Sequence, residues 1–286
     1  MNISVVITTF NRPDFLQEAL VGVSKQALSA FEIIIIDDCS TKSYDDVYPM
    51  VERLQARYLK QKTGVGANAA RNIGIKESSG DIVAFLDDDD VWLPDYLKTI
   101  HDKFLDGAGA VVSGFKQLGK EEVIVSNTDT FVTKASLLRG NTYCGMSGFS
   151  AKRDLLEEML FDEALNNGQD WDMYVRLFQK GVNFANISEP IFLYRFQNED
   201  GIGAKARKMK PDEIDKRLGS AIKHKDFLGD FWFKKRVSEQ ILFSLKHKKP
   251  KLLWISKAIK MAGLKATIYF FLNAIRRKIA NKPMSI

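Results

Sequence analysis

The first part of the chain alternates between short apolar runs and longer segments with helical spacing. Apolar runs, the first two rich in β-branched residues that favour strands, occupy residues 3–7, 31–36 and 82–86, and a further strand is expected at 56–60. Helical spacing occupies residues 13–25, 45–57, 67–78 and 94–105. This alternation predicts a doubly wound α/β fold with a largely parallel sheet that is covered on both faces.

The pattern is less regular further along the chain. Strands are expected at residues 110–114, 123–125 and 187–194, and helices at 154–158 and 170–179. From about residue 211 the pattern becomes Lys-rich and helical, with its clearest break at Pro250. We therefore expect an α/β domain over residues 1–204 and a basic, mainly helical region over 205–286.

Composition agrees with a folded protein that works in a reducing compartment. Hydrophobic residues make up 45% of the 286, which is enough for a sizeable core. The two cysteines, Cys39 and Cys144, have no metal-like spacing, and so few cysteines favour a reducing cytoplasm. The first residues, MNISVVITTF, are typical of a strand rather than an export signal. The expected location is the cytoplasm.

The net charge of +6 is distributed very unevenly. Residues 205–286 hold 22 Lys and Arg against 6 Asp and Glu, whereas residues 1–204 hold 20 against 30. A basic tail of this kind predicts an anionic partner, either a membrane surface or nucleic acid, and no nucleic-acid recognition module is visible. Apolar residues interspersed with Lys and Arg over 252–279 suit a membrane interface. A packed helical subdomain with solvated lysines explains them equally well, and the two can coexist.

Polar clusters follow three of the expected strands: TTFNR after the first, DDCS after the second and DDDD after the segment 82–86. The carboxyl ends of parallel strands share one edge of a sheet, where ligands bind. No phosphate-binding G-x-x-x-x-G-K-[ST] loop is present in the sequence, and the G-x-G-x-x-A match at residues 64–69 follows a polar segment. The acidic edge predicts Mg²⁺ or Mn²⁺ bridging to the phosphates of a ligand.

Simpler interpretations of the same residues stay open. The four consecutive aspartates can form a solvated turn, in which Asp90 caps the helix expected near Pro94. Asp37 and Asp38 can form a turn after their strand. The three histidines, His101, His224 and His247, are expected at the surface.

Four segments of the chain resemble successive signatures of family 2 glycosyltransferases. They are SVVITTFNRPDFLQEAL, FEIIIIDDCS, GVGANAARNIGIKESSGDIVAFLDDDD and GQDWDMYVRL, in the family's order between about residues 3 and 195. The resemblance implies a GT-A fold and inverting transfer of a sugar from a nucleotide diphosphate, taken here as a uridine diphosphate. It also implies a role in bacterial surface polysaccharide synthesis, such as O-antigen, capsule, exopolysaccharide or lipopolysaccharide core.

The resemblance also assigns residues to the donor site. It places Thr8, Phe10 and Asn11 at the base and ribose, Asp38 at the uracil ring, and Arg71 and Asn72 near the diphosphate. Asp87 and Asp89 fall on the two acidic positions of the DxD motif, with Asp89 as the metal ligand and Asp87 at the ribose or sugar. Asp88, between them, is grouped with the donor site without a defined contact.

Asp170, in GQDWDM, matches the family's catalytic base. An N-cap role for the helix that follows is the alternative, and the two roles are compatible. The chain departs from the family at Gln169, where Glu is common, and has no His shortly after Arg195.

The expected partners are a nucleotide-sugar donor, a glycan or lipid-linked acceptor and an anionic membrane surface. The expected placement is peripheral, on the inner face of the cytoplasmic membrane. Two other functions remain open: a nucleotidyltransferase that makes nucleotide sugars, and a non-catalytic module that binds them. The nucleotidyltransferase is disfavoured, because its glycine-rich signature is replaced here by TTFNRP.

Overall fold

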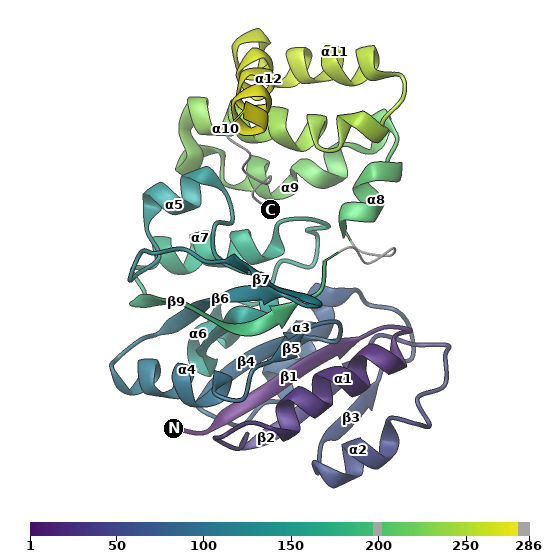
Figure 1. Cartoon of the computed structure of the whole chain (residues 1–286), viewed down its shortest axis with the longest axis vertical. Helices are drawn as coiled ribbons and strands as arrows, with labels where there is room; N and C mark the ends of the chain where they lie inside the picture. Colours follow the sequence, from purple (N-terminus) through teal and green to yellow (C-terminus); the bar gives the residue numbers. More distant parts are fainter. Residues whose placement is uncertain (197–201, 280–286) are drawn as a thin grey trace. The chain divides into compact units, whose positions relative to one another are not determined.

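A computed structural model describes residues 1–196 and 202–279, which form two compact units (Figure 1). The sheet unit comprises residues 1–133, 143–163 and 176–196, and the helical unit comprises residues 134–142, 164–175 and 197–286. The units are thus interleaved along the chain, and helix α7 (Gln169–Gln179) begins in one and ends in the other. The division at residues 204 and 205 stays a prediction.

The sheet unit is built on one mixed sheet. Its strands are β1 (Ile3–Thr9), β2 (Glu32–Asp37), β3 (Arg57–Lys60), β4 (Ile82–Asp87), β5 (Val91–Trp92), β6 (Ala110–Gln117), β7 (Lys120–Val125), β8 (Phe149–Lys152) and β9 (Phe184–Tyr194). Their spatial order is β3-β2-β1-β4-β8-β6-β9-β5, and β7 pairs with β6.

Half of this sheet has the parallel order that the sequence predicts. Strands β3, β2, β1 and β4 are parallel neighbours, and the central strand β1 is buried along nearly its whole length. Strand β8 then runs antiparallel between β4 and β6, so the other half is mixed. Strand β8 has only four residues and no strong apolar run, so the sequence does not predict it.

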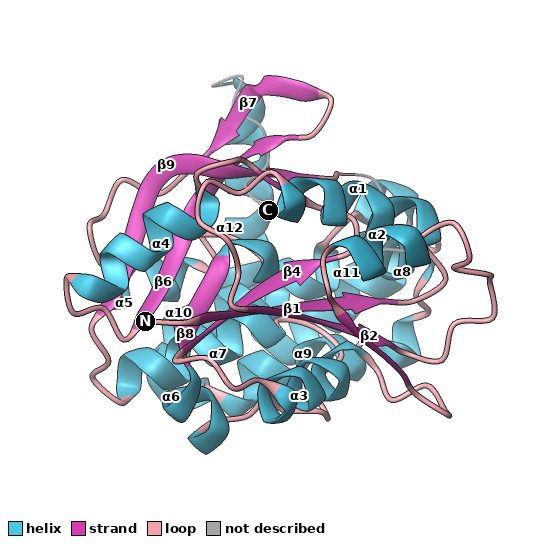
Figure 2. Cartoon of the chain, turned by 90° about the horizontal axis from the view of Figure 1, so that it is seen from below, coloured by secondary structure: helices cyan, strands magenta, loops and turns pink. Residues whose placement is uncertain are grey.

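Helices cover both faces of the sheet, as expected. They are α1 (Pro13–Ser24), α2 (Tyr48–Arg53), α3 (Ala67–Glu77), α4 (Tyr96–Leu105) and α6 (Arg153–Glu158), with a short 3₁₀ turn η1 (Met146–Gly148). Figure 2 shows α3 and α6 on one side of the sheet and α1 and α4 on the other. Helix α1 starts with Pro13, whose missing N–H costs nothing in the first turn.

Helix α3 lies very close to the central strand because of a glycine. A Cβ atom on Gly74 would come 2.2 Å from Cγ1 of Val6 in β1. Any larger residue would push the helix away from the sheet, since the protein interior leaves no room for overlap. Gly74 therefore fixes the distance at which α3 presents Arg71 to the edge of the sheet.

The helical unit has a hydrophobic core of its own. Besides the first residues of α7, its elements are α5 (Lys134–Arg139), α8 (Ile202–Lys208), η2 (Pro211–Glu213), α9 (Asp215–Lys223), α10 (Lys225–Leu242), η3 (Leu245–His247), α11 (Lys251–Ala262) and α12 (Leu264–Ile279). Leu218, Ile241 and Trp254 are almost fully buried at the centre of this core. The helices predicted for the C-terminal region are present, and they share a core.

Within the described part of the chain, no helix has the length and apolar character needed to span a membrane.

Candidate active site

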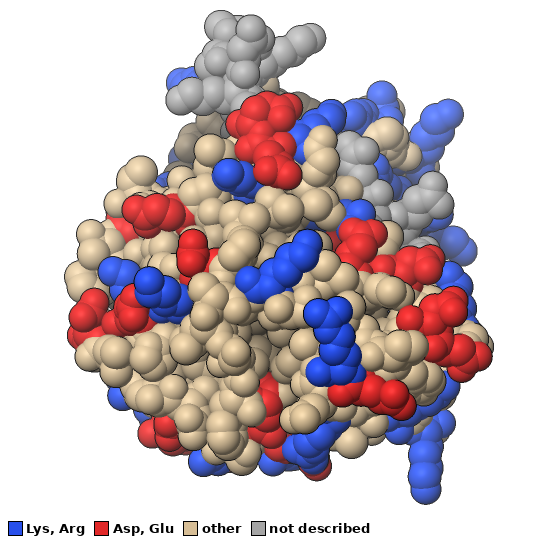
Figure 3. Space-filling model, turned by 60° about the horizontal axis from the view of Figure 1, so that its bottom comes forward, with Lys and Arg blue, Asp and Glu red and all other residues tan. Residues whose placement is uncertain are grey.

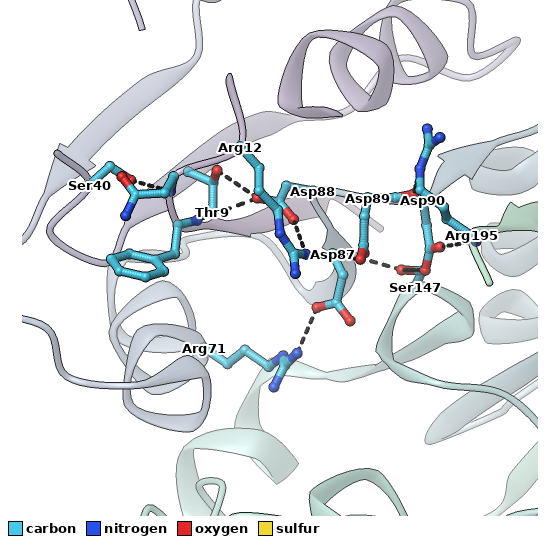
Figure 4. Close-up of polar contacts among 12 residues, drawn as sticks. Thr9, Arg12, Ser40, Arg71, Asp87, Asp88, Asp89, Asp90, Ser147 and Arg195 are labelled. Atoms are coloured by element: carbon cyan, nitrogen blue, oxygen red, sulfur yellow. Dashed lines mark hydrogen bonds and ion pairs between the residues drawn. The ribbon is translucent and has the colours of Figure 1, made fainter. Parts of the chain in front are cut away.

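Three parallel strands of the sheet unit end together at one edge. In the sheet register Thr8 lies between Ile36 of β2 and Asp87 of β4, and Thr9 lies beside Asp37. The residues that follow these strands are therefore brought together, as Figure 4 shows. The predicted polar edge is present.

The aspartate quartet (residues 87–90) alternates between exposed and buried side chains. Asp88 and Asp90 are only 4% and 1% exposed, whereas Asp87 and Asp89 are partly exposed. A solvated turn would leave all four carboxylates in water, so that simpler interpretation is wrong. The Asp90 N–H donates to the Asp87 carbonyl at 3.2 Å, so the four residues form a turn with two side chains buried and two partly exposed.

Asp88 is held by a chain of buried hydroxyl groups. The Thr9 hydroxyl donates to Asp88 Oδ2 at 2.7 Å, and Thr9 Oγ1 lies 2.7 Å from the Tyr44 hydroxyl. Arg12 Nη1 donates to Asp88 Oδ1 at 3.3 Å. Burial, reinforced by the charge of Asp89, raises the pKa of Asp88 to about 7. Asp88 therefore has a structural role: it holds Thr9 and Arg12 in place at the edge.

Asp90 is structural, but it does not cap a helix. Its carboxylate accepts from Ser147 Oγ at 2.6 Å and from the Arg195 backbone N–H at 2.8 Å. Helix α4 begins at Tyr96, after Asp95, so the predicted cap by Asp90 is wrong. Burial, followed by the charge of Asp89, raises the pKa of Asp90 well above its ordinary value.

The two outward carboxylates already face cationic side chains. Arg71 Nη2 donates to Asp87 Oδ1 at 2.6 Å, and Arg12 Nη1 lies 2.9 Å from Asp89 Oδ2. Burial and the charge of Asp87 raise the pKa of Asp89, while Arg12 opposes this. Four adjacent aspartates are tolerated here because two guanidinium groups and several hydrogen bonds compensate for their repulsion.

A divalent cation fits this group of carboxylates. Oxygens of Asp87, Asp89 and Asp90 lie within 4.8 Å of one another, and carboxylate oxygens are the ligands that Mg²⁺ and Mn²⁺ prefer. Both oxygens of Asp90 accept hydrogen bonds from the protein. Asp87 and Asp89, which are more exposed, are the better candidates to reach an ion.

The residues after β1 have two different roles at this edge. Phe10 is 53% exposed. An aromatic side chain that contacts a nucleotide base needs such exposure. Asn11 adopts a left-handed φ of 56°, and its Oδ1 accepts from the backbone N–H groups of Thr41 and Lys42. The Asn11 side chain thus fixes the loop that follows β2.

The two aspartates at the end of β2, Asp37 and Asp38, each accept hydrogen bonds from a loop. Asp37 is buried and accepts from the Ser40 N–H at 2.8 Å, which confirms the predicted turn. Asp38 accepts from the N–H groups of Val65 and Gly66 at 2.5 and 2.9 Å. Asp38 therefore holds the backbone immediately before α3, which carries Arg71.

Arg71 and Asn72 are neighbours on α3 with different surroundings. The Asn72 amide is buried and exchanges hydrogen bonds with the backbone of Phe161, so it anchors α3 to that segment. Arg71 is 4% exposed, and its Nε has no acceptor among the described residues. Of the two, Arg71 is the group that faces the aspartate quartet.

Asp170 lies in the helical unit, in the first turn of α7. It is partly buried, and Asn141 Nδ2 donates to its Oδ2 at 2.6 Å. The guanidinium of Arg236 stacks 4.0 Å from the centre of the Trp171 ring. Burial lowers the pKa of Arg236 to about 10, although the negative charges of Glu239 and Asp170 oppose this effect. The candidate base is thus held within a rigid, partly cationic environment.

Asp172, two residues further along α7, is completely buried. It accepts from His224 Nε2 at 2.7 Å and from Lys223 Nζ at 2.9 Å. The His224 ring is 6% exposed and meets the Trp171 ring edge to face, with 5.3 Å between their centres. The prediction that His224 lies at the surface is wrong, because a carboxylate distant in sequence draws it into the core.

Sequence reasoning missed the residues that hold the candidate site residues in place. Arg12 follows Asn11 in TTFNRP, and a cation beside an acidic edge was a usable signal. Tyr44, Ser147 and Asn141 carried no local signal, because each acts through a contact distant in sequence.

The chain has clear similarities to known proteins. Residues 4–160 match the family model described as glycosyl transferase family 2. An uncharacterized glycosyltransferase of Bacillus subtilis, YwdF, is 29% identical over 77% of this chain and 85% of its own length. The GalNAc(5)-diNAcBac-PP-undecaprenol β-1,3-glucosyltransferase of Campylobacter jejuni is 29% identical over 72% of this chain and 68% of its own length.

Solved structures share the fold. Residues 1–349 of Staphylococcus aureus TarS, in complex with UDP-GlcNAc, superpose with a TM-score of 0.65 at 16% identity, covering 96% of this chain and 92% of that one. A mannosyltransferase of Pyrobaculum calidifontis, in complex with GDP-Man and Mn²⁺, gives a TM-score of 0.60 at 17% identity over 96% and 80%. At these identities the likeness concerns the fold alone.

Proposed function

Since this chain belongs to glycosyl transferase family 2, we propose that it moves a sugar, with inversion, from a uridine-diphosphate donor to a glycan hydroxyl. It is a glycosyltransferase of bacterial polysaccharide type with a GT-A fold. Membership of this family favours transfer over the two alternatives, nucleotide-sugar synthesis and non-catalytic binding. The observation that carries the proposal is the strand-end edge, where partly exposed carboxylates and two guanidinium groups meet.

The donor binds along this edge. Phe10 offers an aromatic surface to the base, together with Thr8, Asn11 and the loop that Asp38 holds. Arg71 supplies a buried positive charge for the diphosphate, and its unpaired Nε is consistent with a ligand acceptor. Asp87 contacts the ribose or the sugar, Asp88 supports the edge from behind, and Asn72 acts by holding α3.

Asp89 would hold Mg²⁺ or Mn²⁺, with help from Asp87. When bound, the ion offsets the negative charge that grows on the departing diphosphate. Arg12 pairs with both Asp88 and Asp89, so it places a positive charge beside the carboxylates that would hold the ion. The mannosyltransferase of similar fold was solved in complex with Mn²⁺, which supports the choice of ion.

Asp170 acts as the general base. Inversion requires one group that removes the proton of the acceptor hydroxyl as its oxygen forms a bond to the anomeric carbon and the bond to the diphosphate breaks. The partly buried carboxylate of Asp170 is fixed by Asn141, which orients one oxygen and leaves the group in a defined position. Asn141 is therefore a positioning residue for this reaction.

The acceptor is a glycan carried on a membrane lipid, and the enzyme works peripherally at the cytoplasmic face of the membrane. The Campylobacter jejuni relative acts on a sugar linked to undecaprenol, and a Bacillus subtilis relative, TuaG, is named for teichuronic acid synthesis. O-antigen, capsule, exopolysaccharide and lipopolysaccharide core are the polymers of this class. A basic helical region suits such a location.

A donor panel tests the proposal directly. The purified chain is incubated with UDP- and GDP-sugars, a lipid-linked glycan acceptor, and either Mn²⁺ or a chelator, and the product is analysed by mass spectrometry and NMR. We expect transfer from one UDP-sugar that stops with chelator, and the opposite anomeric configuration in the product. Transfer with retained configuration, or from GDP-sugars alone, would refute the mechanism or the donor.

A further inference from the structure

Helices α11 and α12 bury one face each in the core of the helical unit. Trp254, Ala258 and Ala262 of α11 belong to that core, and Ala266 and Phe270 of α12 pack against it. These contacts account for only part of the apolar residues that the sequence places between residues 252 and 279. The remaining ones need another explanation.

Beside its buried face, α12 carries an exposed apolar stripe. Leu264, Ile268, Leu272 and Ile275 are 57%, 48%, 49% and 56% exposed. At about 100° per residue these four positions fall within an arc of about 80°, away from Ala266 and Phe270 and bordered by Phe271, which packs against the core. We call these four residues the α12 stripe. An apolar row of this kind on a helix marks a surface that meets something apolar.

The neighbouring helix adds to the exposed apolar surface. Leu252 and Leu253, at the start of α11, are 80% and 48% exposed, and Ile259 is exposed on the same face as Leu252, two turns further along. Lys260 lies among them and is also exposed. Both helices thus show apolar and basic side chains to the outside and use their small or aromatic residues inside.

Positive charge lies directly beside the α12 stripe. Lys265 and Arg276 are exposed and follow the stripe at about 100° and 120° around the helix from Leu264. Residues 241–286 contain 11 Lys and Arg and no Asp or Glu. By contrast, acidic and basic side chains are interspersed over the face of the molecule in Figure 3. Long basic side chains beside an apolar row can reach phosphate groups while their stems stay on the apolar surface.

A second copy of the chain is a poor partner for this surface. Two such faces would bring like charges together, with no acidic residue in residues 241–286 to compensate. A membrane containing anionic lipids instead offers an apolar layer for the α12 stripe and phosphates for Lys265 and Arg276. We propose that the outer face of α11 and α12, centred on the α12 stripe, docks the enzyme on an anionic lipid bilayer.

This inference deepens the proposed membrane location and rests on that part of the proposed function. It names the residues that enter the interface, and it needs no donor, metal or base. Docking would hold the enzyme where lipid-linked acceptors are concentrated. Transfer to a soluble acceptor does not depend on it, so the two proposals fail in different experiments.

The test compares two double variants of the full chain. Ile268→Glu with Leu272→Glu places two charges in the α12 stripe. Leu105→Glu with Ile124→Glu is the matched control, because both residues are exposed apolar side chains of the sheet unit, at 62% and 55%. Co-sedimentation is measured with phosphatidylcholine vesicles and with vesicles that also contain phosphatidylglycerol, while sedimentation velocity reports the oligomeric state.

We expect the wild type and the control to bind the anionic vesicles, and the stripe variant to bind at least about tenfold more weakly. Lys265→Gln with Arg276→Gln should reduce the preference for anionic lipid. Equal loss in both Glu variants, or no binding by the wild type, would overturn the proposal. So would a wild-type dimer that the stripe variant dissociates without any vesicle binding. Turnover of a soluble acceptor should be the same in all variants.

Discussion

The aspartate quartet at the end of β4 and the pair Asp170 and Asp172 of α7 both combine buried and partly exposed carboxylates. Asp87 and Asp89 are partly exposed while Asp88 and Asp90 are buried, in a turn that the Asp90 N–H closes on the Asp87 carbonyl. In α7 the buried residue is Asp172, and the partly exposed one is Asp170. Each region therefore separates a carboxylate available for chemistry from one that holds the fold.

The difference lies in how the buried carboxylates are compensated. In the quartet, burial and neighbouring aspartates raise the pKa of Asp88, Asp89 and Asp90, and the single guanidinium of Arg12 is shared between Asp88 and Asp89. Asp172 instead has two basic partners, Lys223 and His224, from the end of α9. A crowded acidic site is ready to accept a cation, whereas a paired aspartate fixes a helix.

Replacing Asp170 by Asn should have the largest effect on turnover. Loss of the base lowers kcat about a thousandfold, while the KM for the donor changes little. Steady-state kinetics with a soluble acceptor measure both. Asp226→Asn, an exposed aspartate of the same unit, serves as the control and should retain full activity. A kcat near that of the wild type in Asp170→Asn would remove this residue from the mechanism.

Asp89→Ala should abolish metal-dependent turnover while the fold persists. We expect at least about a hundredfold loss in kcat and a matching loss of Mn²⁺ affinity, because the ion loses its main carboxylate. Calorimetry with Mn²⁺ alone gives the affinity, and circular dichroism verifies folding. The exposed Asp102→Ala is the comparison variant. Unchanged Mn²⁺ binding would place the ion elsewhere.

Asp172→Ala should instead act on stability. It leaves His224 and Lys223 without their buried partner, which costs about 3 kcal/mol in the free energy of unfolding. Urea unfolding measures this cost, and Asp170→Ala should destabilise the protein much less. If the two substitutions cost the same, the proposed division of roles within α7 is wrong.

Asn141→Ala should give the smallest effect. The Asp170 carboxylate loses one oriented hydrogen bond, so kcat falls about tenfold and the KM for the donor stays the same. Asn167→Ala, in the same unit, is a control for loss of an amide.

The parts of the fold that the sequence predicts are those with local signals. Strands β1, β2 and β4 and the acidic edge after them follow from apolar runs that end in polar residues. Strands β5 and β8 have two and four residues, too few for a readable alternation. Such strands exist because neighbouring strands pair with them.

For the candidate site too, the sequence predicts only what has a local signal. Sequence patterns and the family resemblance named the carboxylates, but not what surrounds them. Ser147 reaches Asp90 from 57 positions away, and His224 reaches Asp172 from 52. Contacts of this range depend on how whole elements pack, so no local pattern could indicate that His224 is buried.

The interleaving of the two units limits how this enzyme can be divided. Cutting the chain after residue 204 would keep Asp170 but remove His224 and Arg236, the side chains packed around Trp171. We expect such a fragment to retain the acidic edge and lose the order of its base. For the same reason, C-terminal helices grafted from a relative would replace the surroundings of the base together with the outer surface.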